Sequence, residues 1–100
     1  MLSVNEIRQD LHDIRYYYSR KDAFDNSGLI NQITEKVKRY NAAVRTAAPR
    51  LFDLYVCLYI HSNTQETVAA ELGWSAVYVQ KLHKRLLQFF EAQFKKGGAA

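Results

Sequence analysis

Residues 64–90 have the sequence TQETVAAELGWSAVYVQKLHKRLLQFF, which is the most informative stretch of the chain. Ala69 is small enough for two helices to cross closely. Gly73 would follow the first helix, where a left-handed backbone favours a residue without a side chain. Thr64 and Ser75 can each cap a helix by accepting a hydrogen bond from an early backbone N–H group. This spacing predicts a helix–turn–helix in which the recognition helix begins after Ser75.

The helix–turn–helix is expected to pack against an apolar helix that precedes it. Pro49 suits the first turn of that helix, which extends to about His61 and is apolar almost all round, so it should be the most buried one. The lone cysteine, Cys57, falls within it and is expected to be a buried, inert thiol. The predicted core residues of this unit are Leu54, Leu58, Val68, Leu72, Val79 and Leu82.

Two amphipathic helices are predicted before Pro49. Apolar residues recur at spacings of three and four in both. The first helix is expected to end near residues 25–28, and the second ends before the proline. The apolar stripes comprise Val4, Ile7, Leu11, Ile14 and Tyr18 in the first helix and Ile33, Val37, Tyr40 and Val44 in the second.

The whole chain is therefore predicted to be all-α, with about five helices in one compact domain. Residues 1–46 would form a helical hairpin for interaction or dimerisation, and residues 47–96 the helix–turn–helix unit. Residues 97–100 would be a frayed tail.

Positive charge is concentrated in the predicted recognition helix and the residues after it. Residues 80–100 hold five basic residues against one acidic, whereas residues 47–79 hold one basic residue against three acidic. The net charge of +4 and the pI near 9.3 favour an acidic partner, first of all nucleic acid. The alternative is an ordinary structural pair of helices joined by a glycine turn.

The predicted DNA-binding residues lie on the face of the recognition helix opposite its apolar seam. Gln80 can pair with adenine through two hydrogen bonds, and Lys81 can donate to guanine. Ala76 and Val77 can contact thymine methyl groups. Phosphate contacts are predicted for Thr64, Gln65, Ser75, Lys84 and Arg85. Each of these side chains has the alternative of being simply solvated.

Aromatic residues suggest a protein interface in the N-terminal half. Tyr16, Tyr17 and Tyr18 are consecutive and cannot all face one core, so at least one is exposed or contacts a partner. Tyr16 and Tyr17, together with Phe24, form the predicted interface, for a second copy of the chain or for RNA polymerase. The alternative is that the hairpin only covers apolar surface of the later helices.

Several classes of function have no support in the sequence. No spacing of Cys, His and carboxylates resembles a zinc site, and we find no Gly-rich phosphate loop and no nucleophile–base pattern. We therefore predict no enzyme, no catalytic residue, no metal and no cofactor. The longest strongly apolar stretch, LYVCLYI, is far shorter than the roughly twenty residues of a membrane span. Without a visible signal peptide, a cytoplasmic location in a bacterial host cell is expected.

Residues 49–90 resemble region 4 of sigma-70 factors, because an apolar helix and a polar turn precede the pattern T-Q-E-x-x-A-x-x-L-G-x-S-x-x-x-V-x-x-L. More loosely, the chain is similar to the small late-operon transcriptional activators of phages and mobile elements. The resemblance implies a DNA-binding regulator. Ala76 and Val77 depart from it, since they occupy positions where the family often carries polar or basic base-contacting residues. No room is left for a sigma core-binding domain, so a complete sigma factor is not expected.

The sequence thus predicts a transcriptional regulator of phage or mobile-element type that binds duplex DNA in the major groove. One alternative is a mimic of sigma region 4 that binds RNA polymerase or a sigma factor with little DNA binding. Another is a phage packaging or recombination accessory protein. A homodimer through the N-terminal half is also predicted, because one recognition helix contacts only a few base pairs.

Overall fold

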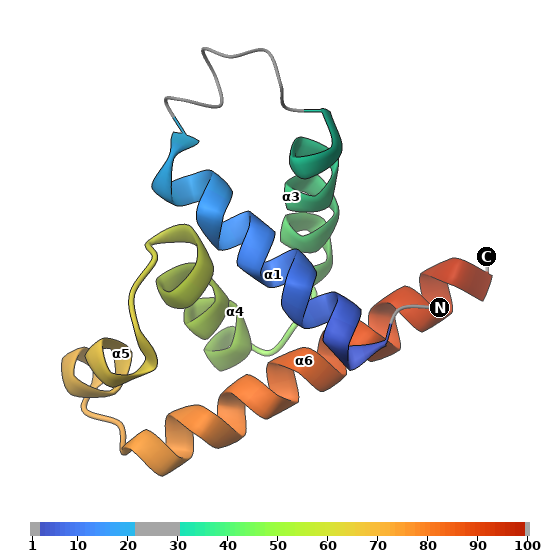
Figure 1. The fold of residues 1–100 in the computed structure, drawn as a ribbon. Helices are drawn as coiled ribbons and strands as arrows, with labels where there is room; N and C mark the ends of the chain where they lie inside the picture. The colour runs from blue at the N-terminus through green and yellow to red at the C-terminus, as the bar shows by residue number, and fades with distance from the viewer. Residues whose placement is uncertain (1–2, 22–30, 100) are drawn as a thin grey trace.

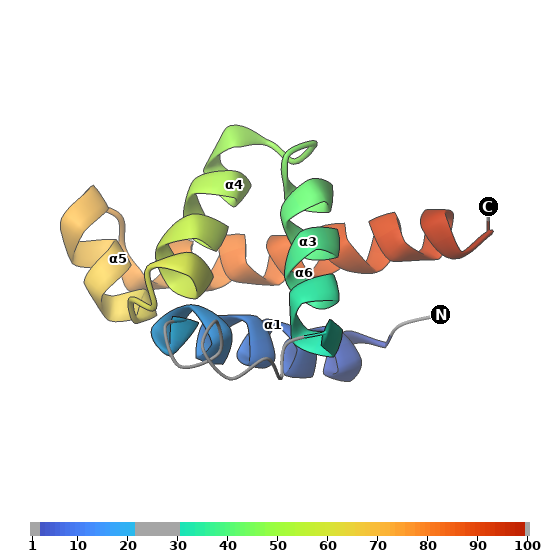
Figure 2. The same cartoon turned by 90° about the horizontal axis from the view of Figure 1, so that it is seen from above.

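The computed structural model describes residues 3–21 and 31–99 of the chain (Figure 1). These residues are all-helical, as predicted, and contain five α-helices and one π-helical turn. The elements are α1 (Val4–Ser19), α3 (Asn31–Val44), α4 (Pro49–Tyr55), η1 (Val56–Ile60), α5 (Gln65–Leu72) and α6 (Ala76–Ala99). Figure 2 shows α1 and α6 running in opposite directions, with α3 and α4 lying across both.

Helix α1 is shorter than the sequence indicated. It begins at the cap of Ser3, whose Oγ accepts a hydrogen bond from the Glu6 N–H at 3.2 Å, and it ends at Ser19. Arg20 leaves the helical conformation with φ −131° and ψ 33°. The predicted end near residues 25–28 is therefore wrong, and those residues themselves lie outside the described part of the chain. Helix α3 ends at Val44, ahead of Pro49 as predicted.

The predicted third helix is not a continuous α-helix to His61. It is α-helical to Tyr55 and then widens into η1, where the His61 N–H bonds to the Val56 carbonyl oxygen at 2.9 Å. The chain then turns through Ser62, which has a positive φ of 58°. The third helical segment thus ends in a single π-helical turn instead of an α-helical one.

This third segment, α4 and η1, packs against α1, α3, α5 and α6, so it is central as expected. It is not buried all round, because Arg50, Phe52 and Asp53 are exposed to solvent. Cys57 is half-buried rather than fully buried, and burial raises the pKa of its thiol.

One apolar cluster joins α1, α3 and the end of α4 to the middle of α6. Its buried residues are Ile7, Leu11, Ile14, Tyr17, Val37, Tyr40, Val44, Tyr55, Leu86, Leu87 and Phe90. The Tyr40 and Phe90 rings lie with their centroids 4.8 Å apart. The apolar stripes of α1 and α3 are thus buried against later helices of the same chain. This is the alternative stated above, in which the hairpin covers apolar surface of the later helices.

Tyr17 is a member of this cluster and is only 6% exposed, so its assignment to a protein interface is wrong. Ile14 is likewise buried, because α1 packs against η1 and α6. Tyr16, on the other side of the helix, is 46% exposed, as expected for at least one of the three tyrosines. Phe24 lies outside the described residues.

A second cluster supports the helix–turn–helix. It contains Leu54, Leu58, Val68, Ala69, Val79 and Leu82, which include five of the six predicted core residues. Leu72 was predicted to be buried here and is instead 43% exposed. It is the last residue of α5, and Trp74 and Tyr78 pack against the cluster from the turn and from α6. Aromatic side chains thus cover the part of the core that Leu72 was expected to fill.

Helix α6 continues further than predicted, through Gly97 and Gly98 to Ala99, so the frayed tail of residues 97–100 is not observed up to that point. Extending an existing helix adds one hydrogen bond per residue, and two glycines weaken it without ending it. Within residues 3–21 and 31–99, no helix is both long and apolar enough to cross a membrane.

Candidate nucleic-acid interface

The turn between α5 and α6 has the geometry that its sequence predicts. The Thr64 Oγ1 accepts a hydrogen bond from the Thr67 N–H at 3.1 Å and so caps α5. Gly73 ends α5 in the left-handed conformation, with φ 68° and ψ 25°. The Ser75 Oγ accepts a hydrogen bond from the Tyr78 N–H at 3.1 Å, which caps α6. Helix α5 therefore begins and ends, and α6 begins, at the residues that the spacing indicated.

Aromatic packing fixes the start of α6 against the rest of the fold. Trp74 and Tyr78 are half-buried and meet edge to face, with ring centroids 5.3 Å apart. The guanidinium of Arg50 in α4 lies 5.7 Å from the centre of the Tyr78 ring and donates a hydrogen bond to its hydroxyl. These two aromatic residues thus pack in the turn and hold α6 in place.

The four predicted base-contacting residues share the solvent face of the first turns of α6. Val77 is 59% exposed, and Ala76, Gln80 and Lys81 are exposed as well. The seam on the opposite side of the helix is buried through Val79 and other apolar residues. The helix therefore presents two polar and two apolar side chains to any partner that approaches this face.

The predicted phosphate-contacting residues surround this face. Lys84 and Arg85 follow on the next turn of α6 and are exposed. Thr64 and Ser75 are exposed at the starts of the two helices, and Gln65 is half-buried. The structure thus brings all nine predicted DNA-contacting residues to α6 and to the two helix starts beside it.

Charge on α6 is of one sign over its first four turns. Lys81, Lys84 and Arg85 precede its first acidic residue, Glu91. Among residues 3–21 and 31–99, none of the three cations forms an ion pair. Their charges are therefore available to an anionic partner, and the strength of that attraction depends on ionic strength.

His83, on the same helix, serves the fold instead of the interface. Its Nε2 lies 2.5 Å from the hydroxyl oxygen of Tyr59 in η1. Burial, with a smaller contribution from the charge of Arg8, lowers the pKa of His83, while burial raises the pKa of Tyr59 to about 12. A neutral His83 imidazole and a protonated Tyr59 hydroxyl can therefore share a hydrogen bond, and this bond ties α6 to η1. The two residues are 24 apart in sequence, so no local pattern could have revealed the contact.

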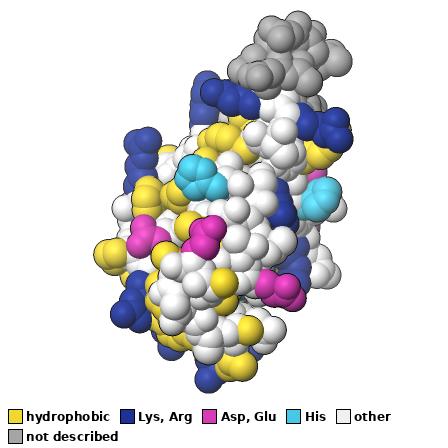
Figure 3. Space-filling view, turned by 90° about the vertical axis from the view of Figure 1, so that its left-hand side faces the viewer, with side chains coloured by type: hydrophobic (Ala, Val, Ile, Leu, Met, Phe, Trp, Pro, Cys, Tyr) yellow, Lys and Arg dark blue, Asp and Glu magenta, His cyan; other side chains and the backbone are white. Residues whose placement is uncertain are grey.

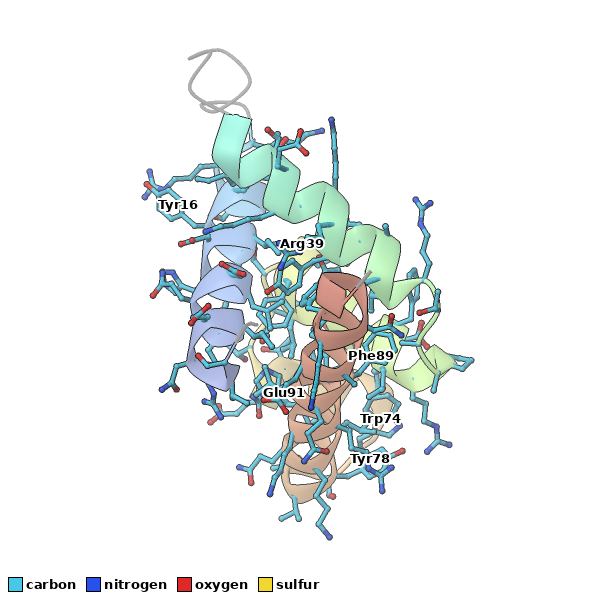
Figure 4. All side chains as sticks on the ribbon, turned by 90° about the vertical axis from the view of Figure 1, so that its right-hand side faces the viewer. Tyr16, Arg39, Trp74, Tyr78, Phe89 and Glu91 are labelled. Atoms are coloured by element: carbon cyan, nitrogen blue, oxygen red, sulfur yellow. The ribbon has the colours of Figure 1, made fainter. Side chains whose placement is uncertain are left out.

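The predicted protein interface is not assembled near the DNA-binding residues. Figure 4 shows Tyr16 on α1 at one end of the molecule and Trp74 and Tyr78 at the other. Tyr16 is covered on one side by Arg20, whose guanidinium lies 5.1 Å from the ring centre. With Tyr17 buried, Tyr16 is the one residue of the predicted trio that the described structure leaves accessible.

The described residues contain no group of three or more His, Cys, Asp or Glu side chains that could hold a metal ion. Comparison of the chain with protein-family models, curated protein sequences and solved structures yields no match. The features of the molecule that bear on its function are therefore the geometry and charge of α5 and α6.

Proposed function

We propose that this protein is a regulator of transcription that binds duplex DNA by placing the start of α6 in the major groove. The observation that carries the proposal is the exposed face of α6, where Gln80 lies beside the three unpaired cations Lys81, Lys84 and Arg85 on a helix packed against the second cluster. An α-helix fits the major groove, and amide and ammonium groups there can distinguish base pairs. Such a regulator of phage or mobile-element type would act in the cytoplasm of its bacterial host.

Residues at different distances along α6 would contact different parts of the DNA. Residues of its first two turns, with Gln80 and Lys81 as the hydrogen-bonding members, would contact base edges. Lys84 and Arg85 lie a turn further on and would contact phosphates, together with the capped start of α5 at Thr64. Base contacts determine sequence preference, whereas phosphate contacts determine affinity for any duplex.

The test begins with selection of bound duplexes from a random-sequence pool, followed by fluorescence anisotropy with the selected duplex and a scrambled one. Gln80→Ala and Lys81→Ala should weaken binding to the selected duplex by about 1–3 kcal/mol each and leave the scrambled duplex almost unaffected. Lys84→Ala and Arg85→Ala should weaken both alike. Lys38→Ala, an exposed charge on α3, is the control. If none of the four variants differs from the control, α6 does not bind DNA.

A second candidate function is an adaptor that binds RNA polymerase or a sigma factor by protein contacts. It is favoured by a groove of about 560 Å³ between the start of α4 and α6, lined by Ala48, Pro49, Arg50, Leu51, Tyr78, Leu82 and Arg85. Ala48→Glu would place a charge at the rim of this groove, which shares only Arg85 with the predicted DNA-contacting residues. Loss of polymerase binding in this variant, with no DNA binding by the parent protein, would favour the adaptor.

A further inference from the structure

The charges of α1 are segregated onto two edges of the helix. Its acidic side chains Asp10 and Asp13 face α3, where the Lys36 Nζ lies 3.2 Å from an oxygen of Asp10 and 2.9 Å from one of Asp13. The Tyr40 hydroxyl also donates to Asp10 at 2.7 Å. These two carboxylates are therefore committed to the contact between α1 and α3, although an oxygen of Asp13 also lies 4.0 Å from the His12 Nδ1 on the other edge.

The other edge of α1 is basic. Arg8, His12 and Arg15 recur at spacings of four and three, which places them on one face of the helix. We call these three residues the α1 basic edge. Among the described residues, neither arginine forms an ion pair. Two arginines without ion pairs on one edge of a helix form a surface to which anions are attracted.

The α1 basic edge faces the same part of the molecule as the DNA-binding residues. The Arg15 Nη2 donates to the Ser62 carbonyl oxygen at 3.0 Å, and Ser62 stands two residues before the cap of α5 at Thr64. At the other end, the charge of Arg8 acts on His83, which lies on α6 between Gln80 and Lys84. The edge therefore begins beside α6 and ends beside the start of α5.

A shallow hollow lies along this edge. It measures about 340 Å³ and is lined by His12, Arg15, Tyr16, Ser19 and Ser62. In the view of Figure 3, a histidine and several basic side chains lie on the right-hand side of the face, together with acidic side chains. The hollow has donors and a cation in its lining and no carboxylate, so a phosphate group suits it better than a cationic ligand.

We propose that the α1 basic edge is a second surface that contacts the DNA backbone. It would contact the same duplex that α6 and the start of α5 bind. The proposal rests on the proposed function and extends it to a helix outside the helix–turn–helix. Arg8 and Arg15 contact phosphates, and these contacts carry no sequence preference. One copy of the chain thereby covers more backbone than α5 and α6 alone, which raises its affinity for any duplex.

The experiment measures how binding to a mixed-sequence duplex of about three helical turns depends on salt. Arg8→Gln and Arg15→Gln are made singly and together, with Lys38→Gln as the control of equal charge change on α3. Each lost phosphate contact lowers the slope of log affinity against log salt by about 0.9, which corresponds to roughly eightfold weaker binding at about 0.1 M salt. The double variant is expected to lose about twice that slope, and the control none of it.

Two further variants separate charge from structure. Arg15→Lys keeps the charge but not the guanidinium that bonds to Ser62, so it should retain most of the slope that Arg15→Gln loses. Arg8→Gln breaks no hydrogen bond of the described structure and should show its effect with an unchanged melting temperature. A double variant that matches Lys38→Gln overturns this inference while the proposed function stands. A parent protein that binds no duplex at all refutes the proposed function itself.

Discussion

Truncation of Leu58 tests how the core supports α6. Leu58 is 4% exposed and lies between α5 and α6 in the second cluster, so Leu58→Ala should lower the free energy of unfolding by about 2–5 kcal/mol. The matched control is Leu72→Ala. That side chain is 43% exposed at the end of α5, so its truncation leaves no comparable cavity and should cost less than about 1 kcal/mol.

Urea titration followed by far-UV circular dichroism gives both values. The slope of the free energy of unfolding against urea should stay the same in the two variants, so that the midpoints report stability alone. Leu58→Ala should also melt at least about 5 °C below Leu72→Ala. Equal losses at the two positions would show that the arrangement of α5 over η1 is wrong.

Three further results are expected. Gly73→Ala should lower the free energy of unfolding by about 1–2 kcal/mol in the same titration. The cause is the backbone φ of 68° and not a clash, because a Cβ at this position would meet no atom within 4 Å. Gly73→Asn should cost less, since Asn tolerates a left-handed backbone better than Ala. The pKa of His83 is lowered from 6.5 in the folded protein, so the unfolded chain binds more protons, and the free energy of unfolding should fall as the pH drops below about 6.5. His83→Gln can still accept a hydrogen bond from Tyr59 and should flatten this loss of stability. An unchanged dependence of stability on pH in this variant would contradict the buried neutral imidazole. Tyr17→Ala should lower the melting temperature far more than Tyr16→Ala, and a reversed order would show that α1 is turned the other way.

The parts of the structure that follow local rules could be predicted from the sequence. The caps at Thr64 and Ser75 and the left-handed Gly73 depend only on residues within a few positions, and all three are as expected. The apolar spacing along α1 and α3 identified their buried faces in the same way. The exposed face of α6 followed from the position of its seam.

The parts that depend on tertiary contacts could not be predicted. The widening at η1 leaves the apolar pattern of residues 56–60 unchanged, so only the backbone hydrogen bonds reveal it. Leu72 satisfies the helical spacing, yet Trp74 and Tyr78 cover the core near the turn. The contact between Tyr59 and His83 and the ion pairs of Lys36 with Asp10 and Asp13 join residues far apart in the chain.

The most direct test of the central claim is a backbone amide NMR titration of the labelled protein with a selected duplex. The account predicts that the largest shifts map to residues 76–84 at the start of α6 and to Thr64 and Gln65 at the start of α5, with a second set at Arg8 and Arg15 on α1. Shifts confined to the groove between α4 and α6, or no shifts at duplex concentrations that saturate specific binders, would contradict it.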